Sequence, residues 1–260
     1  MIFNKIHNFN RIIIDWYKIH KRDLPWRNTN DPYKIWISEI ILQQTRVKFA
    51  IDYYKNFIKK FPTIDSLSEA GEDDVLKLWQ GLGYYSRARN IHYTSKILKE
   101  KYLSIFPQKY DDIIKLKGIG RYTTGAILSF SFKKKYPVVD GNVFRFFSRL
   151  FYINQFIDTN GGQNYFYTIA EKLMCEKDPD LFNQAIIEFG ALVCKPKNPT
   201  CSVCIFNDKC EANKKNKVFE LPLKKNNTKT TDRFLIFVLG TNKSIFLKKK
   251  KYGIWKGLYI

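Results

Sequence analysis

Four cysteines near the end of the chain constrain its folding more than any other feature. Cys194, Cys201, Cys204 and Cys210 follow one another as C-x6-C-x2-C-x5-C. This spacing differs from the paired CxxC knuckles of a zinc ribbon, in which two separate hairpins each supply two sulfurs to one ion. It agrees better with a single loop wrapped round an iron–sulfur cube that accepts four cysteines. We therefore predict a 4Fe-4S cluster at 194–210, with zinc and unliganded thiols as the alternatives.

Disulfide bonds are the weakest explanation of these cysteines. The chain has five cysteines, an odd number, and Cys175 stands apart from the other four. The first ten residues, MIFNKIHNFN, are not a signal peptide. Because disulfides persist mainly in oxidising compartments, we expect a protein of the reducing cytoplasm.

The charge and composition favour a soluble protein with a polyanionic partner. A hydrophobic content of 45% is enough for one large or two small cores, and no apolar run approaches the roughly 20 residues of a membrane span. The net charge of +21 favours a nucleic-acid partner. Lysine, asparagine, isoleucine, phenylalanine and tyrosine are all abundant, however, as an AT-biased genome would produce whatever the function. The charge therefore raises the expectation of nucleic-acid binding without settling it.

Apolar residues recur at three- and four-residue steps along most of the chain. Segments such as 50–61, 73–79 and 87–101 show this pattern, which is typical of helices with one buried face. Short breaks at proline or glycine separate such segments up to about residue 192. We therefore predict an all-α fold with two helical subdomains.

The composition changes after the cysteine loop. Residues 214–232 are polar and charged, which favours a linker, and residues 233–239 have the pattern of one strand. We expect a helical domain at 1–213, the linker, and a β fragment at 233–260 that is too short to close a core by itself.

Two glycines and one acid indicate an anion-binding turn near a candidate catalytic group. Gly118 and Gly120 lie in LKGIGR, just before a helical run from about Tyr122. Such a hairpin exposes backbone N–H groups, and the helix adds its positive N-terminal end, so a DNA phosphate would fit. An ordinary turn between helices is the alternative. Asp140 ends an apolar run at the expected start of the next helix, where it would form an N-cap.

A second acid, Glu39, lies in an almost entirely apolar stretch, IWISEIIL. Burial raises the pKa of a carboxyl group, which would make Glu39 a proton donor near neutral pH. A buried glutamate that only hydrogen-bonds to nearby backbone is the alternative.

Taken together, these residues resemble a known family. The resemblance is to the adenine DNA glycosylases (MutY) of the helix-hairpin-helix superfamily, which also contains endonuclease III, and it runs from about Trp16 to Cys210. The strings that carry it, followed by the four-cysteine loop, are SEIILQQT (38–45), WQGLGYYSRARN (79–90), LKGIGRYTTGAI (116–127) and VVDGNV (138–143).

The resemblance implies base excision repair of double-stranded DNA that contains adenine opposite 8-oxoguanine or guanine. It implies that Glu39 protonates the leaving adenine while Asp140 stabilises the oxocarbenium-like sugar. It also implies that Asn142 orients Asp140 or the water, and that Tyr122 forms a hydrogen bond near Asp140. The enzyme would act as a monomer on DNA, with the 4Fe-4S cluster in a structural role.

The resemblance further implies a set of contacts with the DNA. The target base must leave the stack, and side chains must hold the gap open. The implied contacts are Gln44 and Tyr84 as inserted side chains, Leu24, Trp26, Arg27 and, less strongly, Gln184 in the adenine pocket, and Gly118 and Gly120 at the phosphate. The alternative for Tyr84, Leu24 and Trp26 is that they are ordinary core residues.

Two alternatives to this function stay open. An endonuclease III-like pyrimidine glycosylase and lyase would carry a nucleophilic lysine right after the hairpin, where this chain has Tyr122. Some relatives also have a lysine where this chain has Phe144. We therefore expect a monofunctional glycosylase that uses water. A non-catalytic DNA-binding remnant is the second alternative, against which the two acids weigh.

The end of the chain resembles the beginning of a Nudix-like domain. Residues 233–260 would be its first strands, and GIWKGLY (253–259) resembles its early loop. We therefore expect this chain to carry only a truncated form of that domain.

Overall fold

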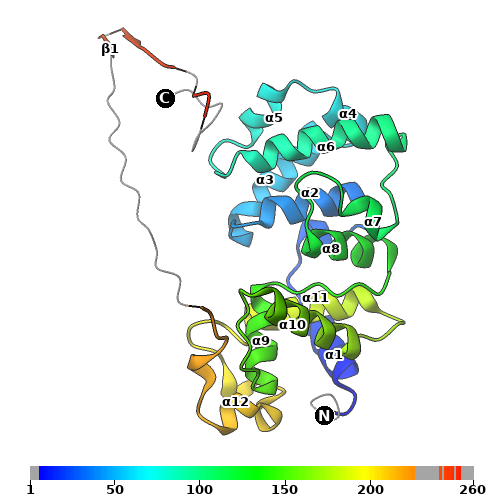
Figure 1. The fold of residues 1–260 in the computed structure, drawn as a ribbon, viewed down its shortest axis with the longest axis vertical. Coiled ribbons are helices and arrows are strands. Elements are labelled where there is room, and N and C mark those ends of the chain that lie inside the picture. The colour runs from blue at the N-terminus through cyan, green and yellow to red at the C-terminus, as the bar shows by residue number, and fades with distance from the viewer. Residues whose placement is uncertain (1–5, 226–239, 242, 249, 253–260) are drawn as a thin grey trace. The chain divides into compact units, whose positions relative to one another are not determined.

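The structure is a computed structural model that describes residues 6–225, 240–241, 243–248 and 250–252. It divides into one unit of residues 1–225 and a second of residues 226–260. In chain order, the α-helices of the first unit are α1 (Phe9–His20), α2 (Pro32–Leu42), α3 (Val47–Lys60), α4 (Ile64–Ser68), α5 (Glu72–Leu78), α6 (Ser86–Tyr102), α7 (Tyr110–Ile113), α8 (Arg121–Phe132), α9 (Gly141–Phe151), α10 (Asn160–Leu173), α11 (Pro179–Leu192) and α12 (Glu211–Lys214). The 3-10 helices are η2 (Pro25–Arg27), η3 (Cys201–Val203), η4 (Asn207–Lys209) and η5 (Val218–Glu220). The predicted all-α fold is confirmed (Figure 1).

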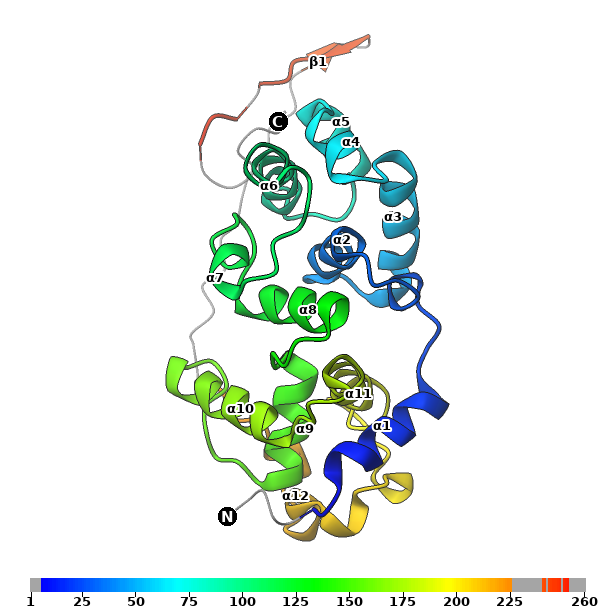
Figure 2. The same cartoon turned by 90° about the vertical axis from the view of Figure 1, so that its right-hand side faces the viewer.

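The helices of this unit surround two cores, which we call the first and second lobes (Figure 2). The first lobe contains α2 to α8 and the second contains α1 and α9 to α12 with the cysteine loop. The predicted helical segments 50–61, 73–79 and 87–101 correspond to α3, α5 and α6 and are confirmed. Among the described residues, none of the helices combines the length and apolar character that a membrane crossing requires.

Helix α2 is the centre of the first lobe. Ile35, Trp36, Ile37, Ile40 and Ile41 are all buried, although they lie on different sides of the helix. A helix that is apolar on every side must be surrounded by other elements. Both α3 and α8 pack against α2. Any polar side chain on this helix is therefore drawn into the interior with it.

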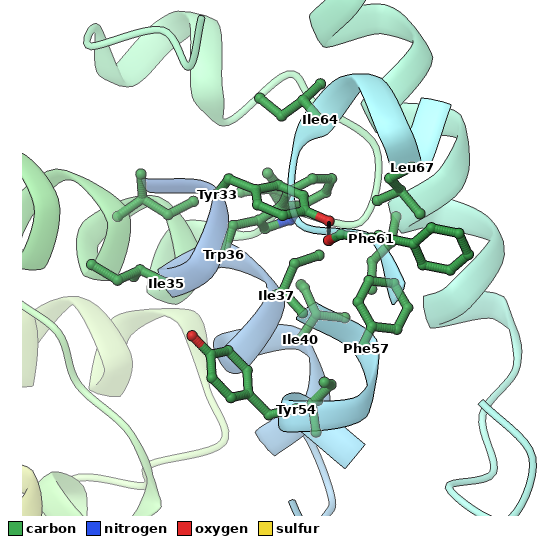
Figure 3. Packing of buried hydrophobic residues seen from close by; sticks show 14 of the residues in the cluster. Tyr33, Ile35, Trp36, Ile37, Ile40, Tyr54, Phe57, Phe61, Ile64 and Leu67 are labelled. Atoms are coloured by element: carbon green, nitrogen blue, oxygen red, sulfur yellow. Dashed lines mark hydrogen bonds between the residues drawn. The ribbon is translucent and has the colours of Figure 1, made fainter. Parts of the chain in front are cut away.

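The start of α2 is held by local and distant contacts. Pro32 occupies the first turn, and the Asp31 side chain accepts a hydrogen bond from the Tyr33 backbone N–H, as N-terminal caps do. The Tyr33 hydroxyl donates to the Phe61 carbonyl oxygen at 2.7 Å, inside the cluster of aromatic and branched side chains that Figure 3 shows. Burial of this hydroxyl is therefore offset by a hydrogen bond.

Helix α11 joins the two lobes. It packs against α1 and α9 in the second lobe and against α8 in the first. Its Asn183 side chain is fully buried, donates to Ser129 Oγ on α8 at 2.8 Å and accepts from the Val138 backbone N–H at 3.0 Å. These bonds hold the segment by which the chain returns from α8 to α9, and this segment ends at Asp140.

The cysteine loop is packed on the second lobe by an aromatic side chain. Phe206 is buried, and its ring centroid lies 5.2 Å from that of Phe9 and 5.4 Å from that of Phe189. Phe9 and Phe189 belong to α1 and α11, so the loop is bound to two distant parts of the chain.

The segment after the loop differs from the linker that composition indicates. Within 214–225, Val218 and Leu221 are buried, and the Arg149 Nε donates to the Leu221 carbonyl oxygen at 3.1 Å. The Leu223 carbonyl oxygen accepts from the Ile157 backbone N–H at 3.0 Å. The composition does not predict this packing, because only a few apolar residues among many lysines form it. Residues 226–232 lie outside the described residues.

The second unit contains a short hairpin. Strands β1 (Gly240–Thr241) and β2 (Ser244–Ile245) pair antiparallel, with Gly240 opposite Ile245. The predicted strand at 233–239 and the Nudix-like loop at 253–259 lie outside the described residues.

Candidate active site

A cavity of about 860 Å³ lies between the two lobes. Its lining comes from α2 and α8 of the first lobe and from α1, α9, α10 and α11 of the second. Of the residues that the sequence indicates, it is lined by Leu24, Trp26, Arg27, Glu39, Gln44, Gly120, Tyr122, Asp140, Asn142 and Gln184. Tyr84 and Gly118 do not line it. Folding thus gathers residues that are far apart in the chain round one space.

Glu39 is carried into the interior by α2. Only 6% of the residue is exposed, and the exposed part faces the cavity. Burial raises the pKa of the Glu39 carboxyl to about 7, because the charged form loses its hydration, and the nearby Asp140 adds to the rise. A hydrogen bond from Tyr122 and the charge of Arg27 oppose it. The carboxyl therefore holds a proton near neutral pH.

Asp140 caps the N-terminus of α9, as the sequence predicts. Its Oδ1 accepts from the backbone N–H groups of Asn142 and Val143, each at 2.9 Å, and its Oδ2 accepts from Asn142 Nδ2 at 2.7 Å. Burial raises the pKa of Asp140, and these three bonds oppose the rise because they favour the carboxylate. The two acids thus belong to different lobes and have different environments.

Tyr122 interacts with both acids. It is in the first turn of α8, and its pKa is raised well above the usual value by burial and by the charges of Glu39 and Asp140. The hydroxyl therefore stays protonated and can donate a hydrogen bond to a carboxylate. A phenol in this place cannot form a Schiff base, since it has no amine.

Arg145 supports Asn142 from behind, and sequence reasoning missed it. Its Nη2 donates to Asn142 Oδ1 at 2.9 Å and to the Gly190 carbonyl oxygen at 2.6 Å, and its Nε donates to the Cys194 carbonyl oxygen at 2.7 Å. With its oxygen bound to Arg145, the Asn142 amide turns its Nδ2 toward Asp140. No sequence signal reveals this role, because Arg145 is simply one basic residue among many.

Arg27 is held in the cavity wall by a buried acid that sequence reasoning also missed. The Glu188 side chain is fully buried and accepts from Arg27 Nη2 at 2.7 Å and from Arg22 Nη2 at 2.6 Å. Burial alone would raise the pKa of Glu188, but the hydrogen bonds from Arg22 and Arg27 lower it to about 2. The sequence did contain a signal of burial, because Glu188 lies in the apolar stretch AIIEFGAL just as Glu39 lies in IWISEIIL.

The remaining wall residues differ in how they are held. Leu24 and Trp26 are buried in the core of the first lobe and also face the cavity. Gln184 lies on α11, and its Oε1 accepts from the Tyr17 hydroxyl at 2.7 Å. Gln184 also lines the cavity.

Two exposed turns carry Gln44 and Tyr84. Both residues have left-handed backbone conformations, with φ of 59° and 46°, which is uncommon for residues other than glycine. Gln44 lies at the rim of the cavity, and Tyr84 is 67% exposed. Such conformations are often found at binding sites.

The hairpin glycines have different surroundings. Gly118 has φ of 82°, and a Cβ atom there would come within 2.8 Å of the Asn90 side chain, so another residue would not fit. Gly120 is the N-cap residue of α8 and has no neighbour within 4 Å of such an atom. The exposed hairpin leads directly into a helix of 12 residues, as the sequence predicts.

Comparison with known proteins identifies the family. The model of the HhH-GPD superfamily base excision DNA repair proteins matches residues 37–163. The adenine DNA glycosylase of Buchnera aphidicola subsp. Baizongia pistaciae is 45% identical over 257 residues, which cover 96% of this chain and 72% of that protein. The chain belongs to the adenine DNA glycosylases.

A eukaryotic relative carries the same name, and solved structures share the fold. The human adenine DNA glycosylase is 37% identical over 213 residues, which cover 78% of this chain and 39% of the human protein. Among solved structures, a thermostable thymine-DNA glycosylase has a TM-score of 0.74 and 27% identity, covering 80% of this chain and 95% of that one. An endonuclease III structure, at 22% identity and a TM-score of 0.68, shares the fold. The glycosylase is therefore an enzyme of base excision repair that hydrolyses the bond between adenine and deoxyribose.

The four cysteines of the glycosylase line one small cavity, of about 30 Å³. Among the described residues, no group of three or more His, Cys, Asp or Glu side chains is arranged to hold a metal ion. Several donors face the sulfurs. Arg149 Nη1 lies 3.6 Å from Cys194 Sγ, and the Phe206 backbone nitrogen lies 3.4 Å from Cys204 Sγ. The backbone N–H groups of Ala212 and Asn213 face the Cys210 sulfur. Apart from Arg149, the lining has no charged side chain. This donor set fits a group that is bound by thiolates.

The placement of Asn142 beside Asp140 can be tested at Gly190, which lies against Asn142. A Cβ atom at Gly190 would come within 2.6 Å of the Asn142 carbonyl oxygen and 2.8 Å of its Cβ, both of which are hard to move. We expect Gly190→Ala to displace Asn142 from Asp140 and to lower the single-turnover rate of adenine release by at least about tenfold. The matched control is Gly161→Ala, since a Cβ there meets nothing within 4 Å. Equal rates for the two variants would contradict the placement of Asn142.

Proposed function

We propose that the glycosylase removes adenine that is mispaired with 8-oxoguanine or guanine in duplex DNA, and that it does so with water and without cleaving the strand. The observation that carries the proposal is the pair of carboxyl groups that line one cavity from different lobes, with Tyr122 close enough to interact with both. One carboxyl holds a proton near neutral pH, and the other is stabilised as a carboxylate by three hydrogen bonds. A pair of titratable groups with different environments is the usual sign of an acid and an anionic partner.

Glu39 supplies the proton in this mechanism. The bond between adenine and C1′ of the deoxyribose breaks more easily when the leaving base is protonated, because adenine then departs without a negative charge. Glu39 gives its proton to a ring nitrogen of the base and becomes a carboxylate. The Tyr122 hydroxyl and the Arg27 guanidinium, which both favour the charged form, then stabilise that carboxylate.

Asp140 stabilises the sugar. As the bond to adenine breaks, positive charge develops on C1′ and the ring oxygen, and a carboxylate nearby lowers the energy of that state. Water then adds to C1′ and gives a proton to the Glu39 carboxylate, which restores the acid and leaves an abasic site and free adenine. Asn142 and Arg145 keep the Asp140 carboxylate in place throughout.

We propose DNA contacts at the cavity, at the two exposed turns and at the hairpin. We assign the adenine pocket to Leu24, Trp26, Arg27 and Gln184, which line the cavity beside Glu39. Gln44 and Tyr84 would enter the duplex and hold it open while the base is out of the stack. The backbone N–H groups of the hairpin at Gly118 and Gly120, with the N-terminus of α8, would bind a phosphate.

Single-turnover assays on defined duplexes test the function. We expect adenine release opposite 8-oxoguanine and opposite guanine, with strand nicking only after alkali, because neither Tyr122 nor Phe144 offers an amine to the sugar. Nicking before alkali would contradict the monofunctional reaction. Release of an oxidised pyrimidine would favour the endonuclease III-like alternative, and tight binding with no release would favour a non-catalytic protein.

The pH dependence tests the role of Glu39. The reaction needs the protonated acid, so with a pKa of about 7 the rate should be high below pH 7 and fall about tenfold per pH unit well above it. It should also fall in acid, once Asp140 is protonated. Glu39→Gln should bind the duplex with unchanged affinity, lose roughly 10²- to 10⁴-fold in rate and lose the decline above pH 7. A wild-type rate that keeps rising through pH 8 would show that Glu39 is not the acid.

We also propose that Cys194, Cys201, Cys204 and Cys210 hold a 4Fe-4S cluster. Such a group cross-links the loop covalently, which fixes Phe206 and the basic side chains of the loop, and the hydrolysis itself needs no electron. The support is the all-sulfur donor set round one cavity and the N–H groups that face the sulfurs.

Metal analysis of two serine variants tests the cluster. We expect the purified protein to contain iron and acid-labile sulfide in equal amounts, and Cys204→Ser to lose most of both. The control is Cys175→Ser, because Cys175 lies outside the loop and does not line the cavity. Zinc in place of iron, or the same iron content in Cys204→Ser as in Cys175→Ser, would exclude the proposed cluster.

A further inference from the structure

Arg87 makes an unusual set of contacts away from the cavity. The residue is 8% exposed and lies in the first turn of α6. Its Nη1 donates to the carbonyl oxygens of Ile40 at 2.9 Å and Ile41 at 3.2 Å, and also to that of Gln43. Its Nη2 donates to the carbonyl oxygens of Leu82 at 3.1 Å and Gly83 at 3.2 Å. One guanidinium thus binds two separate segments of backbone.

The position of this charge is not explained by α6 itself. A cation in the first turn of a helix faces the positive end of the helix dipole, which is unfavourable. The carbonyl oxygens of Ile40, Ile41 and Gln43, however, belong to the end of α2, whose last turn lacks partners within the helix. A cation at that end is favourable. The placement of Arg87 therefore serves α2 and the turn after it.

Burial of Arg87 has a cost that its hydrogen bonds to carbonyl oxygens help to offset. Burial lowers the pKa of Arg87, and no carboxyl group of the described residues contributes to holding its charge. Its Nε has no hydrogen-bond partner among the described residues. A buried charge that donates its hydrogen bonds to carbonyl oxygens of two segments keeps its energy low only while both segments stay where they are.

Each bound segment leads directly into one of the exposed turns. The carbonyl of Gln43 precedes Gln44, and the carbonyl of Gly83 precedes Tyr84. Gln44 and Tyr84 are the two residues with left-handed conformations that were described above. A conformation of this kind costs about 1–3 kcal/mol and persists only where the surroundings hold it.

A second group of contacts strengthens the turn at Tyr84. The Trp79 Nε1 donates to the Gly83 carbonyl oxygen at 3.1 Å, so this oxygen accepts from two side chains. The Arg87 guanidinium lies 5.2 Å from the Trp79 ring centroid and 5.7 Å from that of Tyr84. Cation–π contacts at these distances are attractive and directional. Arg87 therefore contacts both the backbone before Tyr84 and its ring.

We propose that Arg87 is a positioning residue that joins these two turns, so that Gln44 and Tyr84 enter the duplex as one rigid unit. This inference rests on the proposed role of Gln44 and Tyr84 in opening the DNA. Without Arg87 the two turns move independently, and the cost of taking adenine out of the stack is no longer met by a preorganised pair of side chains. The chemistry at Glu39 and Asp140 is unaffected, because Arg87 does not line the cavity.

The experiment compares a paired with an unpaired adenine. Arg87→Lys keeps the charge but cannot bind both segments in the fork geometry of a guanidinium, and Arg87→Met removes the charge as well. We expect both variants to release adenine opposite 8-oxoguanine at least about tenfold more slowly than wild type does. For adenine opposite an abasic analogue, the rate of release should fall by less than about threefold. The control is Arg89→Met, which removes a charge that is paired with Glu72 on the outside of α6.

A spectroscopic signal separates positioning from a general loss of structure. With 2-aminopurine beside the target adenine, binding of wild type should raise the fluorescence as the stack opens, and binding of Arg87→Lys should raise it much less. An equal loss of rate on both substrates with an unchanged fluorescence response would overturn the proposal. If Arg87→Met does not fold, Arg87→Lys by itself carries both readouts.

A double-mutant cycle tests the rigid unit directly. In wild type, Gln44→Ala and Tyr84→Ala should be strongly non-additive in their effect on the paired substrate, because each disables the same unit. In the Arg87→Lys background the two effects should become additive. If neither alanine variant slows release, the proposed role of Gln44 and Tyr84 fails. If both slow it but remain non-additive without the arginine, the role stands and the coupling through Arg87 is wrong.

Discussion

The burial of α2 is the constraint on which the site depends. Because this helix is apolar on nearly all sides, it lies at the centre of the first lobe and brings the Glu39 carboxyl with it. A carboxyl that has lost its hydration holds a proton to about pH 7. The same helix ends at Leu42, so its terminal carbonyl groups and the turn at Gln44 lie at the edge of the cavity. One element thus supplies both the proposed acid and one of the proposed DNA contacts.

The second lobe supplies a carboxyl group in a different environment. Asp140 is also buried, but as an N-cap it accepts two backbone N–H groups and one side-chain amide, which favour its carboxylate form. The site therefore needs both lobes at a fixed separation. Helix α11 provides this, since Asn183 binds the segment before Asp140 and Glu188 binds Arg27 in the wall of the cavity.

Two arginines hold other parts of the site in place by donating hydrogen bonds to backbone carbonyl oxygens. Arg145 binds the carbonyl groups of Gly190 and Cys194 beside its contact with Asn142, and Arg87 binds five carbonyl groups on two segments. A guanidinium has five N–H donors in a fixed plane, so one side chain can hold several strained or unpaired backbone groups at once. Lysine, which is far more abundant in this chain, cannot do this with the same geometry.

Local patterns in the sequence were enough for the helices and for the two acids. Periodicity placed α3, α5 and α6, the apolar surroundings of Glu39 predicted its burial, and the run before Asp140 predicted the N-cap. The packed segment at 214–225 was taken for a linker, because its lysines outweigh the few apolar residues that dock it.

What the sequence determined by itself was therefore what depends on near neighbours in the chain: helix periodicity, caps, the burial of a carboxyl on an apolar helix, and the spacing of four cysteines. Only the tertiary structure decided the partners, because Glu188 and Arg27 are 161 residues apart and Arg87 and Gln43 are 44 apart. The energy of a buried charge depends on which groups surround it in space, and a linear pattern does not contain that information.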